Sequence, residues 1–470
     1  MAASRPYQPP TPDPAVFAGW EQYPANLQNY DPVQTRGIQL NRQITNVASD
    51  LFDQYIRVRV IDIVEQGGAL TCRRDVYTDA AALRGVISPK ANPRIRIISI
   101  NQSGSITPLQ ITKELMLQIL TRYQVLPEFL EVLLSFGSIP HVAEAGNSNL
   151  AVVESDGGTK HTSYQFRYAE ENHTPLKPPW SIRQTGVYHQ HNTQFDLWIL
   201  LNPVGGSSLE RQLEALERFQ SSETLKKITR NPFRLHHLVF DAYIRNWRWH
   251  IRYLGEKFEE KSDLAFVFDP NLASYAVVSF DAVQVLRDLH DDVMALSAHC
   301  NGDLKVIRVL RRQQMIKADI LSLETFSTLL EGYNESLKVL QNRVQNTVEL
   351  IAYALDTKKQ DAAAKLNEHI AGLTTETMDD NATVKLITVF SLIYLPGSFV
   401  GTFYGMNFFG YNSKTRRIEI GKNFWIYVMT WIGLTLVTII FYRLLRMRHD
   451  AQKRKTHRLP LVSTKWASEP

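Results

Sequence analysis

The sequence lacks most of the features that mark secreted proteins and enzymes. Cys72 and Cys300 are the only cysteines among 470 residues and lie far apart, which argues against a disulfide framework or a thiolate zinc site. The opening MAASRPYQPPTPDP has no basic region followed by an apolar core, so we expect no secretory signal. Because no P-loop, nucleophile elbow or metalloprotease motif occurs either, we predict that the protein is not an enzyme.

Positive charge is moderate and gathers near the C-terminus. Lysine and arginine number 52 against 47 acidic residues, which gives a net charge of +5. Residues 443–458 hold seven basic side chains against Asp450 alone. Because this cluster follows an apolar run, an anionic membrane leaflet explains it better than a nucleic acid does. We therefore expect no nucleic-acid partner.

Two long apolar runs predict a membrane hairpin. Residues 384–404 are 21 positions with Lys385 as the single charge, about the length that crosses a hydrocarbon core of roughly 30 Å. The second run, 424–445, carries aromatic residues near its ends, where a lipid–water interface favours them. Since an even number of spans places both flanks on one side, the basic tail predicts that both termini are cytosolic. We expect a two-pass protein in a lipid bilayer.

The rest of the chain predicts a proline-rich arm and an α/β domain. Residues 1–49 contain seven prolines, so we expect an extended arm of low order. Over 50–279, period-two alternation interleaves with helical spacing, which predicts a cytosolic α/β domain. Expected strands cover 55–64, 94–100, 164–168, 180–190 and 195–200. We expect two helices joined at Pro127 within 108–136 and two more within 208–253, where Ser207 and Glu210 form a capping-box pattern.

Four histidines invite a metal-site interpretation. His189 and His191 are two apart on an expected strand, and His236 and His237 are adjacent on an expected helix. Neither spacing brings ligands together by itself. We interpret these histidines as structural or surface residues.

The longest helical pattern leads into the first apolar run. Apolar residues recur every three or four positions, at Leu330, Tyr333, Leu337, Leu340, Val344, Val348, Ile351, Leu355, Ala362, Leu366, Ile370, Leu373 and Thr377. The same spacing reaches Asn381 and Val384, which predicts one helix of roughly 80 residues, about 120 Å long. A helical hairpin and stalk then occupy 280–383, with the spans over 384–446 and a basic tail over 447–470. These apolar residues form one stripe along the helix, and either the preceding helices or copies of the same chain must cover this stripe.

The end of the first span carries a family resemblance. The run YGMNF at 404–408 follows a long stalk, Asn381 at the span entrance and Leu395-Pro396 inside the span. With a short loop, a second span and a basic tail, this pattern resembles the CorA family of divalent metal-ion transporters, and its fungal members most. GMN alone is a common tripeptide, but its place between two spans is specific. Over the N-terminal domain the resemblance rests on architecture and the run WSIRQTGVYHQ.

The resemblance implies a homopentamer with five first spans around a pore and the second spans outside. Gly405, Met406 and Asn407 match the ion-selectivity signature at the outer mouth, where Asn407 would contact the metal ion. Asn381 matches an asparagine at the inner end. Extending the stripe by helical steps gives the expected pore lining Asn381, Val384, Ile387, Ser391, Leu395, Ser398 and Thr402. No cofactor is implied beyond transported, and regulatory, Mg²⁺.

The residue chemistry fits a hydrated divalent ion. Mg²⁺ gives up its water shell reluctantly, so a ring of Asn407 carboxamide oxygens can accept hydrogen bonds from the hydrated ion without holding it too tightly. Gly405 would let the helix end turn sharply. Large apolar groups near the inner end would form a dewetting gate. The alternative role for Asn407 is a plain helix C-cap.

The flanks of the expected pore leave the ion and the function open. The loop 409–423 has four basic residues against Glu419, a balance that repels divalent cations at an outer mouth. Zn²⁺ or another divalent ion, export, and a membrane-anchored sensor or scaffold without transport therefore stay as alternatives. Near the inner end, Glu376, Asp379 and Asp380 predict either a cation-collecting vestibule or an exposed helix face. No organelle address is readable, and we expect the plasma membrane or the vacuole.

Overall fold

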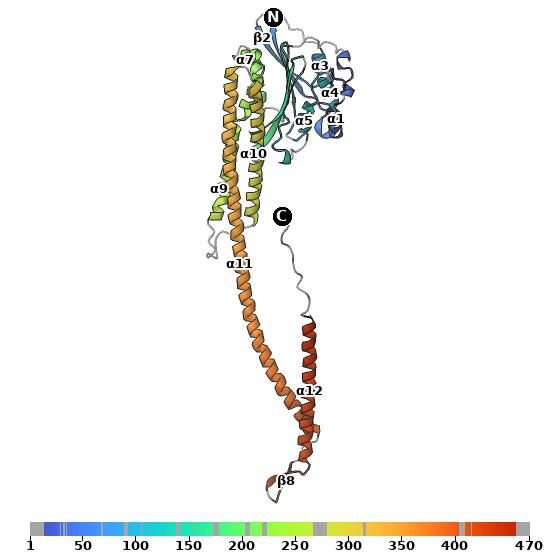
Figure 1. Cartoon of the computed structure of the whole chain (residues 1–470), viewed down its shortest axis with the longest axis vertical. Coiled ribbons are helices and arrows are strands. Elements are labelled where there is room, and N and C mark those ends of the chain that lie inside the picture. Colours follow the sequence, from blue (N-terminus) through green and yellow to red (C-terminus); the bar gives the residue numbers. More distant parts are fainter. Residues whose placement is uncertain are drawn as a thin grey trace, which may run out of the picture. The chain divides into compact units, whose positions relative to one another are not determined.

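The computed structural model describes residues 14–28, 30–31, 33, 35–66, 69–88, 93–104, 106–137, 142–155, 157–172, 178–202, 207–218, 223–266, 280–313, 316–403, 409–414 and 416–456. The chain divides into two compact units, Met1–Asp356 and Thr357–Pro470. One helix, α11 (Lys317–Phe403), contributes to both units (Figure 1).

A seven-stranded sheet forms the centre of the first unit, in the order β2-β1-β3-β7-β6-β5-β4. Its strands are β1 (Val58–Gln66), β2 (Ala69–Tyr77), β3 (Ile95–Asn101), β4 (Ala151–Glu154), β5 (Lys160–Glu171), β6 (Trp180–His191) and β7 (Asp196–Asn202). Neighbours β3 and β7 are parallel, and the other pairs are antiparallel. The five predicted strands are confirmed. The sequence analysis missed β2 and β4, which lie at the two edges of the sheet. The centre of β2 is charged, at Arg73, Arg74 and Asp75, and β4 has only four residues, so neither shows a clear apolar alternation.

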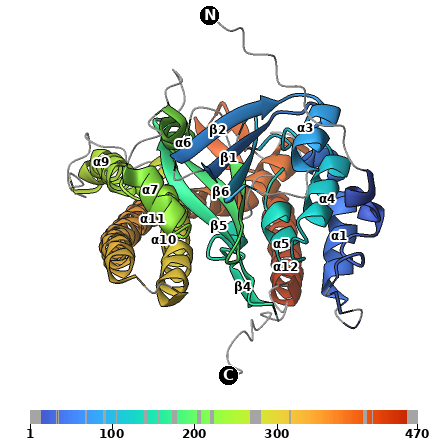
Figure 2. The same cartoon turned by 90° about the horizontal axis from the view of Figure 1, so that it is seen from above.

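Helices cover both faces of this sheet (Figure 2). On one face lie α1 (Arg36–Asn46), α3 (Ala80–Ile87), α4 (Lys113–Arg122) and α5 (Phe129–Leu134), and on the other α6 (Ser208–Arg218), α7 (Glu223–Arg230), α8 (Arg234–Tyr243), α9 (Asn246–Phe266) and α10 (Phe280–Gln313). The predicted pair around Pro127 is confirmed by α4 and α5. The prediction of two helices over 208–253 is wrong, because four begin there, and Pro232 separates α7 from α8.

The prediction of an extended, low-order arm over 1–49 is wrong for the described residues from 14 onward. Two 3₁₀ turns, η1 (Pro14–Phe17) and η2 (Trp20–Gln22), lead into α1 and α2 (Ala48–Leu51). Tyr23 is buried and donates a 2.8 Å hydrogen bond to the carbonyl of Val125, while Ile44 is buried in the same hydrophobic cluster. Of these prolines the structure describes Pro14, the first residue of η1, and Pro24, in a turn after η2, and neither prevents the neighbouring apolar side chains from packing on α4 and α5.

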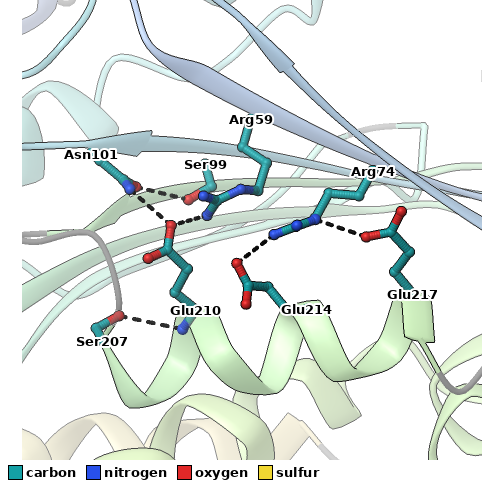
Figure 3. A network of polar contacts seen from close by, with 8 residues as sticks. All are labelled: Arg59, Arg74, Ser99, Asn101, Ser207, Glu210, Glu214 and Glu217. Atoms are coloured by element: carbon teal, nitrogen blue, oxygen red, sulfur yellow. Dashed lines mark hydrogen bonds and ion pairs between the residues drawn. The ribbon is translucent and has the colours of Figure 1, made fainter.

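Helix α6 is attached to the sheet by charged side chains (Figure 3). Glu210 Oε1 accepts hydrogen bonds from Arg59 of β1 and from Asn101 of β3. The Ser207 hydroxyl accepts from the Glu210 amide at 3.3 Å, so the predicted cap at Ser207 is confirmed. The glutamate carboxylate reaches the sheet, a contact that the capping-box pattern did not suggest.

The first part of α11 packs beside α9 and α10 (Figures 1 and 2). Its stripe members Leu330, Leu337, Val344 and Ile351 are buried there, as the helical spacing predicted. Asn334 of α11 accepts a 2.7 Å hydrogen bond from Ser297 of α10. The helix runs for 87 residues without a break, which confirms that stalk and first span form one helix. A long amphipathic helix gains little from local helix propensity. The packing of the apolar stripe on α9 and α10 therefore stabilises this part of α11.

The second unit contains the remainder of α11, a short hairpin and α12 (Phe424–Thr456) (Figure 1). The hairpin strands β8 (Phe409–Asn412) and β9 (Arg417–Ile420) pair antiparallel, where the sequence predicted only a loop. Residues 404–408, which include the YGMNF run, lie outside the described residues.

Candidate ion pathway

Two helices of the second unit are long and apolar enough to cross a membrane. They are Thr383–Thr402 of α11 and Phe424–Arg448 of α12, close to the predicted spans. Most of their large apolar side chains are exposed in the single chain; Val384 and Ile387 are each 59% exposed. A surface this apolar is unfavourable in water, so the two helices fit an integral membrane protein.

The predicted pore stripe lies on this apolar part of α11. Val384, Ile387 and Leu395 are exposed, and Ser391 is half-buried. Ser398 and Thr402 follow in the C-terminal half of the span and are also exposed. Asn381 lies on the same helix, but its side chain is not described, and the same holds for Glu376, Asp379 and Asp380.

The hydroxyl groups of Ser398 and Thr402 direct their protons towards the backbone of their own helix. Ser398 Oγ donates to the Leu395 carbonyl at 3.0 Å, and Thr402 Oγ1 donates to the Ser398 carbonyl at 2.8 Å. A hydroxyl that donates in this way keeps its oxygen lone pairs as acceptors. These two residues can therefore accept hydrogen bonds from the water shell of a cation.

Two glycines that the sequence reading did not single out form the contact with α12. A Cβ atom built on Gly397 would lie 2.7 Å from Trp431 Nε1, and one on Gly401 would lie 3.7 Å from the Tyr427 hydroxyl. Only a residue without a side chain permits the approach at position 397. The four-residue spacing is the small-residue pattern of packed membrane helices, and it was readable in the sequence.

The contact with α12 separates the expected pore lining into two groups. Ser398 and Thr402 each follow a contact glycine by one position, about 100° around the helix, so they lie beside the contact face. Ser391 and Leu395 instead line a groove of about 470 Å³ together with Leu434 and Thr438 of α12. In the single chain, therefore, the stripe is not one uniform face turned away from the second span.

The hairpin between the two apolar helices is basic and exposed. Lys414, Arg417 and Lys422 are exposed, and Arg416 has a positive φ of 50° at the turn before β9. The one acidic residue, Glu419, accepts a 2.7 Å hydrogen bond from Asn412 across the hairpin. The signature residues Gly405, Met406 and Asn407 precede this hairpin and lie outside the described residues.

Comparison with known proteins gives two family matches. The family described as CorA-like transporters matches residues 15–266, which is 252 of 470, and the family described as CorA-like Mg²⁺ transporter protein matches residues 207–446, which is 240 of 470. No curated protein matches the chain.

Similar solved structures are distant in sequence. The CorA magnesium transporter from Methanocaldococcus jannaschii is 12% identical with a TM-score of 0.40, covering 83% of this chain and 98% of that chain. The full-length CmaX protein is 12% identical with a TM-score of 0.36 over 83% and 98%. The ZntB cytoplasmic domain from Vibrio parahaemolyticus is 8% identical with a TM-score of 0.34 over 66% and 100%.

The assignment rests on the family matches, each of which spans more than half of the chain. The α/β domain, the long helix and the two C-terminal apolar helices agree with it. This chain therefore belongs to the CorA-like Mg²⁺ transporter family, whose members are ion transporters and not enzymes.

Proposed function

We propose that the protein is a passive channel for divalent cations, with Mg²⁺ as its main ion, and that five copies surround a pore lined by the span of α11. The observation that carries the proposal is the course of the α11 stripe. Within the first unit the chain's own helices bury it, and beyond Asp356 the same helix continues with its apolar residues uncovered into an apolar span. A second copy of the same helix fits such a stripe, because it offers the same apolar spacing at the same height.

The uncovered part of the stripe gives the first test. Leu366 is 60% exposed and Ile370 is 50% exposed in the single chain. Replacing either with aspartate is expected to dissociate the oligomer, because each buried, unpaired carboxylate costs about 3–5 kcal/mol. Light scattering of the detergent-solubilised protein measures the effect.

The matched control for this test is Asn367→Asp, which adds the same charge one position along the exposed helix. It should leave the assembly intact. An Ile370→Asp protein with the mass of the wild-type assembly would contradict the packing of the stripe between copies.

Ion passage in this proposal uses weak contacts with a hydrated ion. Asn407 of each copy would accept hydrogen bonds from the water shell at the outer mouth, and Ser398 and Thr402 would continue the polar path. Val384 and Ile387 would form an apolar gate nearer the inner end, and Asn381 would lie below it. Glu376, Asp379 and Asp380 would collect cations at the cytosolic side, where Mg²⁺ could also regulate the gate.

A second candidate function follows from the basic outer hairpin. Four positive side chains beside the proposed mouth disfavour divalent cations, so a membrane-anchored sensor or scaffold without transport is the competing proposal. Transport of Zn²⁺ or another divalent ion through the same fold is a variant of the first. In each case both termini would face the cytosol, at the plasma membrane or the vacuole.

Ion flux into proteoliposomes separates these functions. With purified protein and no energy source, an Mg²⁺ gradient should drive uptake that a dye sensitive to Mg²⁺ reports, whereas protein-free vesicles should stay closed. Zn²⁺ flux without Mg²⁺ flux would reassign the ion. Absence of flux for every divalent ion tested would favour the membrane-anchored sensor or scaffold.

A further inference from the structure

Three side chains with metal-ligating atoms meet on the hairpin formed by β6 and β7. His189 and His191 are two apart on β6, so both imidazoles lie on the same face of the sheet. In the antiparallel register, His191 lies directly opposite Asp196 of β7. One ring nitrogen from each histidine and one Asp196 oxygen all lie within 4.8 Å of one another. The interpretation of these histidines as purely structural or surface residues omitted Asp196, which completes the group.

The distances suit a small metal ion. His189 Nε2 lies 3.2 Å from Asp196 Oδ1, and His191 Nδ1 lies 2.6 Å from the same oxygen. Around a tetrahedral zinc ion with bonds of about 2.0–2.2 Å, neighbouring donor atoms are about 3.4 Å apart. The distance between His189 Nε2 and Asp196 Oδ1 already fits this spacing. The distance between His191 Nδ1 and Asp196 Oδ1 would have to lengthen by less than about 1 Å.

The surrounding residues fix the orientation of His189. Its Nδ1 lies 3.2 Å from His236 Nε2, and His236 Nδ1 lies 2.8 Å from the Tyr164 hydroxyl. Trp198 stacks on the His189 ring with centroids 3.9 Å apart. A histidine that uses one ring nitrogen for a hydrogen bond and turns the other towards a shared point has the arrangement of a metal ligand with its supporting shell.

The Asp196 carboxylate is only partly satisfied by hydrogen bonds among the described residues. Asp196 is fully buried, and its Oδ2 has no hydrogen bond among the described residues, with the Arg94 guanidinium 3.6 Å away. An anionic oxygen in this position gains from a nearby cation.

The site is accessible from solvent. The His191 side chain is 29% exposed, and the turn that follows it, at Thr193 and Gln194, is exposed as well. The hairpin end beside His191 therefore offers an ion a route from solvent to the site.

We propose that His189, His191 and Asp196 form a binding site for a zinc-class divalent cation in the α/β domain. Two imidazoles and a carboxylate suit Zn²⁺, Co²⁺ or Ni²⁺, whereas Mg²⁺ prefers six oxygen ligands. The site belongs to the first unit and uses none of the residues assigned to the pore, so it does not depend on the proposed transport. The bound ion would join β6 to β7 and, through His236, brace α8 against the sheet.

Metal content of the full-length protein tests this proposal. Tag-free protein in detergent, stripped with a chelator, is equilibrated with Zn²⁺ in a large excess of Mg²⁺, which occupies any Mg²⁺ sites of the pore, and is then dialysed. Mass spectrometry should find one zinc per chain. His191→Ala and Asp196→Asn should lose it, whereas the control His369→Ala, an exposed histidine on α11, should retain it.

Two results would overturn the proposal. One is wild-type protein that retains no zinc, which would mean that the histidines only hydrogen bond to Asp196. The other is His191→Ala protein with undiminished zinc. Because Asp196→Asn alters a buried group and could impair folding, the decisive variant is His191→Ala, which changes a part-exposed side chain. A second measurement needs no folding assumption: Co²⁺ added to the wild type should give the visible absorption of a four- or five-coordinate site.

Discussion

Replacing Asn407 with alanine is expected to reduce divalent-ion flux at least about tenfold, because a hydrogen bond to a charged partner contributes about 1.5–3 kcal/mol and about 1.4 kcal/mol is a factor of ten. In the proposed pentamer the substitution removes one carboxamide per copy, so the mouth loses the ring of acceptors that contacts the hydrated ion. Initial uptake rates in proteoliposomes at equal protein content measure the loss.

The alternative role of Asn407 is a helix C-cap, and a second substitution separates the two roles. Asn407→Gly removes the carboxamide but supplies the residue that helix C-caps favour most. If the side chain contacts the ion, glycine should be as defective as alanine. Normal flux in Asn407→Gly would indicate a cap and would remove Asn407 from the proposed mouth.

Asn412→Ala is the matched control for both substitutions. This asparagine lies on β8 of the hairpin between the two apolar helices, where its amide donates to Glu419. Its loss should leave flux within about twofold, since an exposed hydrogen bond contributes only about 0.5–1.5 kcal/mol to stability and has no direct contact with the ion.

Breaking the ion pair between Arg59 and Glu210 is expected to destabilise the first unit by about 3–5 kcal/mol, because the remaining charge stays buried without its partner. The Arg59 side chain is 8% exposed and the Glu210 side chain 4%. Glu210 also accepts a 3.0 Å hydrogen bond from Asn101, so Glu210→Ala deprives two buried donors at once (Figure 3). Urea unfolding of the full-length protein, followed by tryptophan fluorescence, measures the change in the free energy of unfolding.

A second arginine in the same network provides the control. Arg74 donates to Glu214 at 2.6 Å and to Glu217 at 2.8 Å, but all three side chains are a quarter to two-fifths exposed. Arg74→Ala should therefore cost no more than about 1 kcal/mol. Equal destabilisation by Glu210→Ala and Arg74→Ala would contradict the special role of the buried pair. The double variant Arg59→Met/Glu210→Leu should recover much of the lost stability, since apolar side chains of similar volume do not leave a charge unpaired.

The spans, the long helix and five strands were predictable, because each depends on a local sequence pattern. The length and composition of the two apolar runs predicted the spans, and the spacing of Leu330, Leu337 and Val344 predicted one helix continuing into the first span. Five strands followed from alternation or β propensity over a few residues. These patterns are local because a helix or strand must present its apolar side chains at its own period.

Errors arose where local patterns were ambiguous. Proline density over 1–49 suggested an arm without regular structure, yet Tyr23 and Ile44 are buried against helices almost a hundred positions further along the chain. Over 208–253 the break at Pro232 was readable but was not used, and the break between α8 and α9 contains neither glycine nor proline. In both cases packing against the sheet decided the structure, which no window of the sequence contains.

The sequence by itself determined the family, the two-span topology and the stalk, because each depends on residues that are neighbours along the chain. Only the tertiary structure decided which distant side chains meet. Arg59 reaches Glu210 across 151 positions, and His189 gains His236 from another element and Asp196 from the neighbouring strand. The physical reason is that strand register and helix docking are set by burial over the whole sheet, so they place ligands and charges together without any signature in the local sequence.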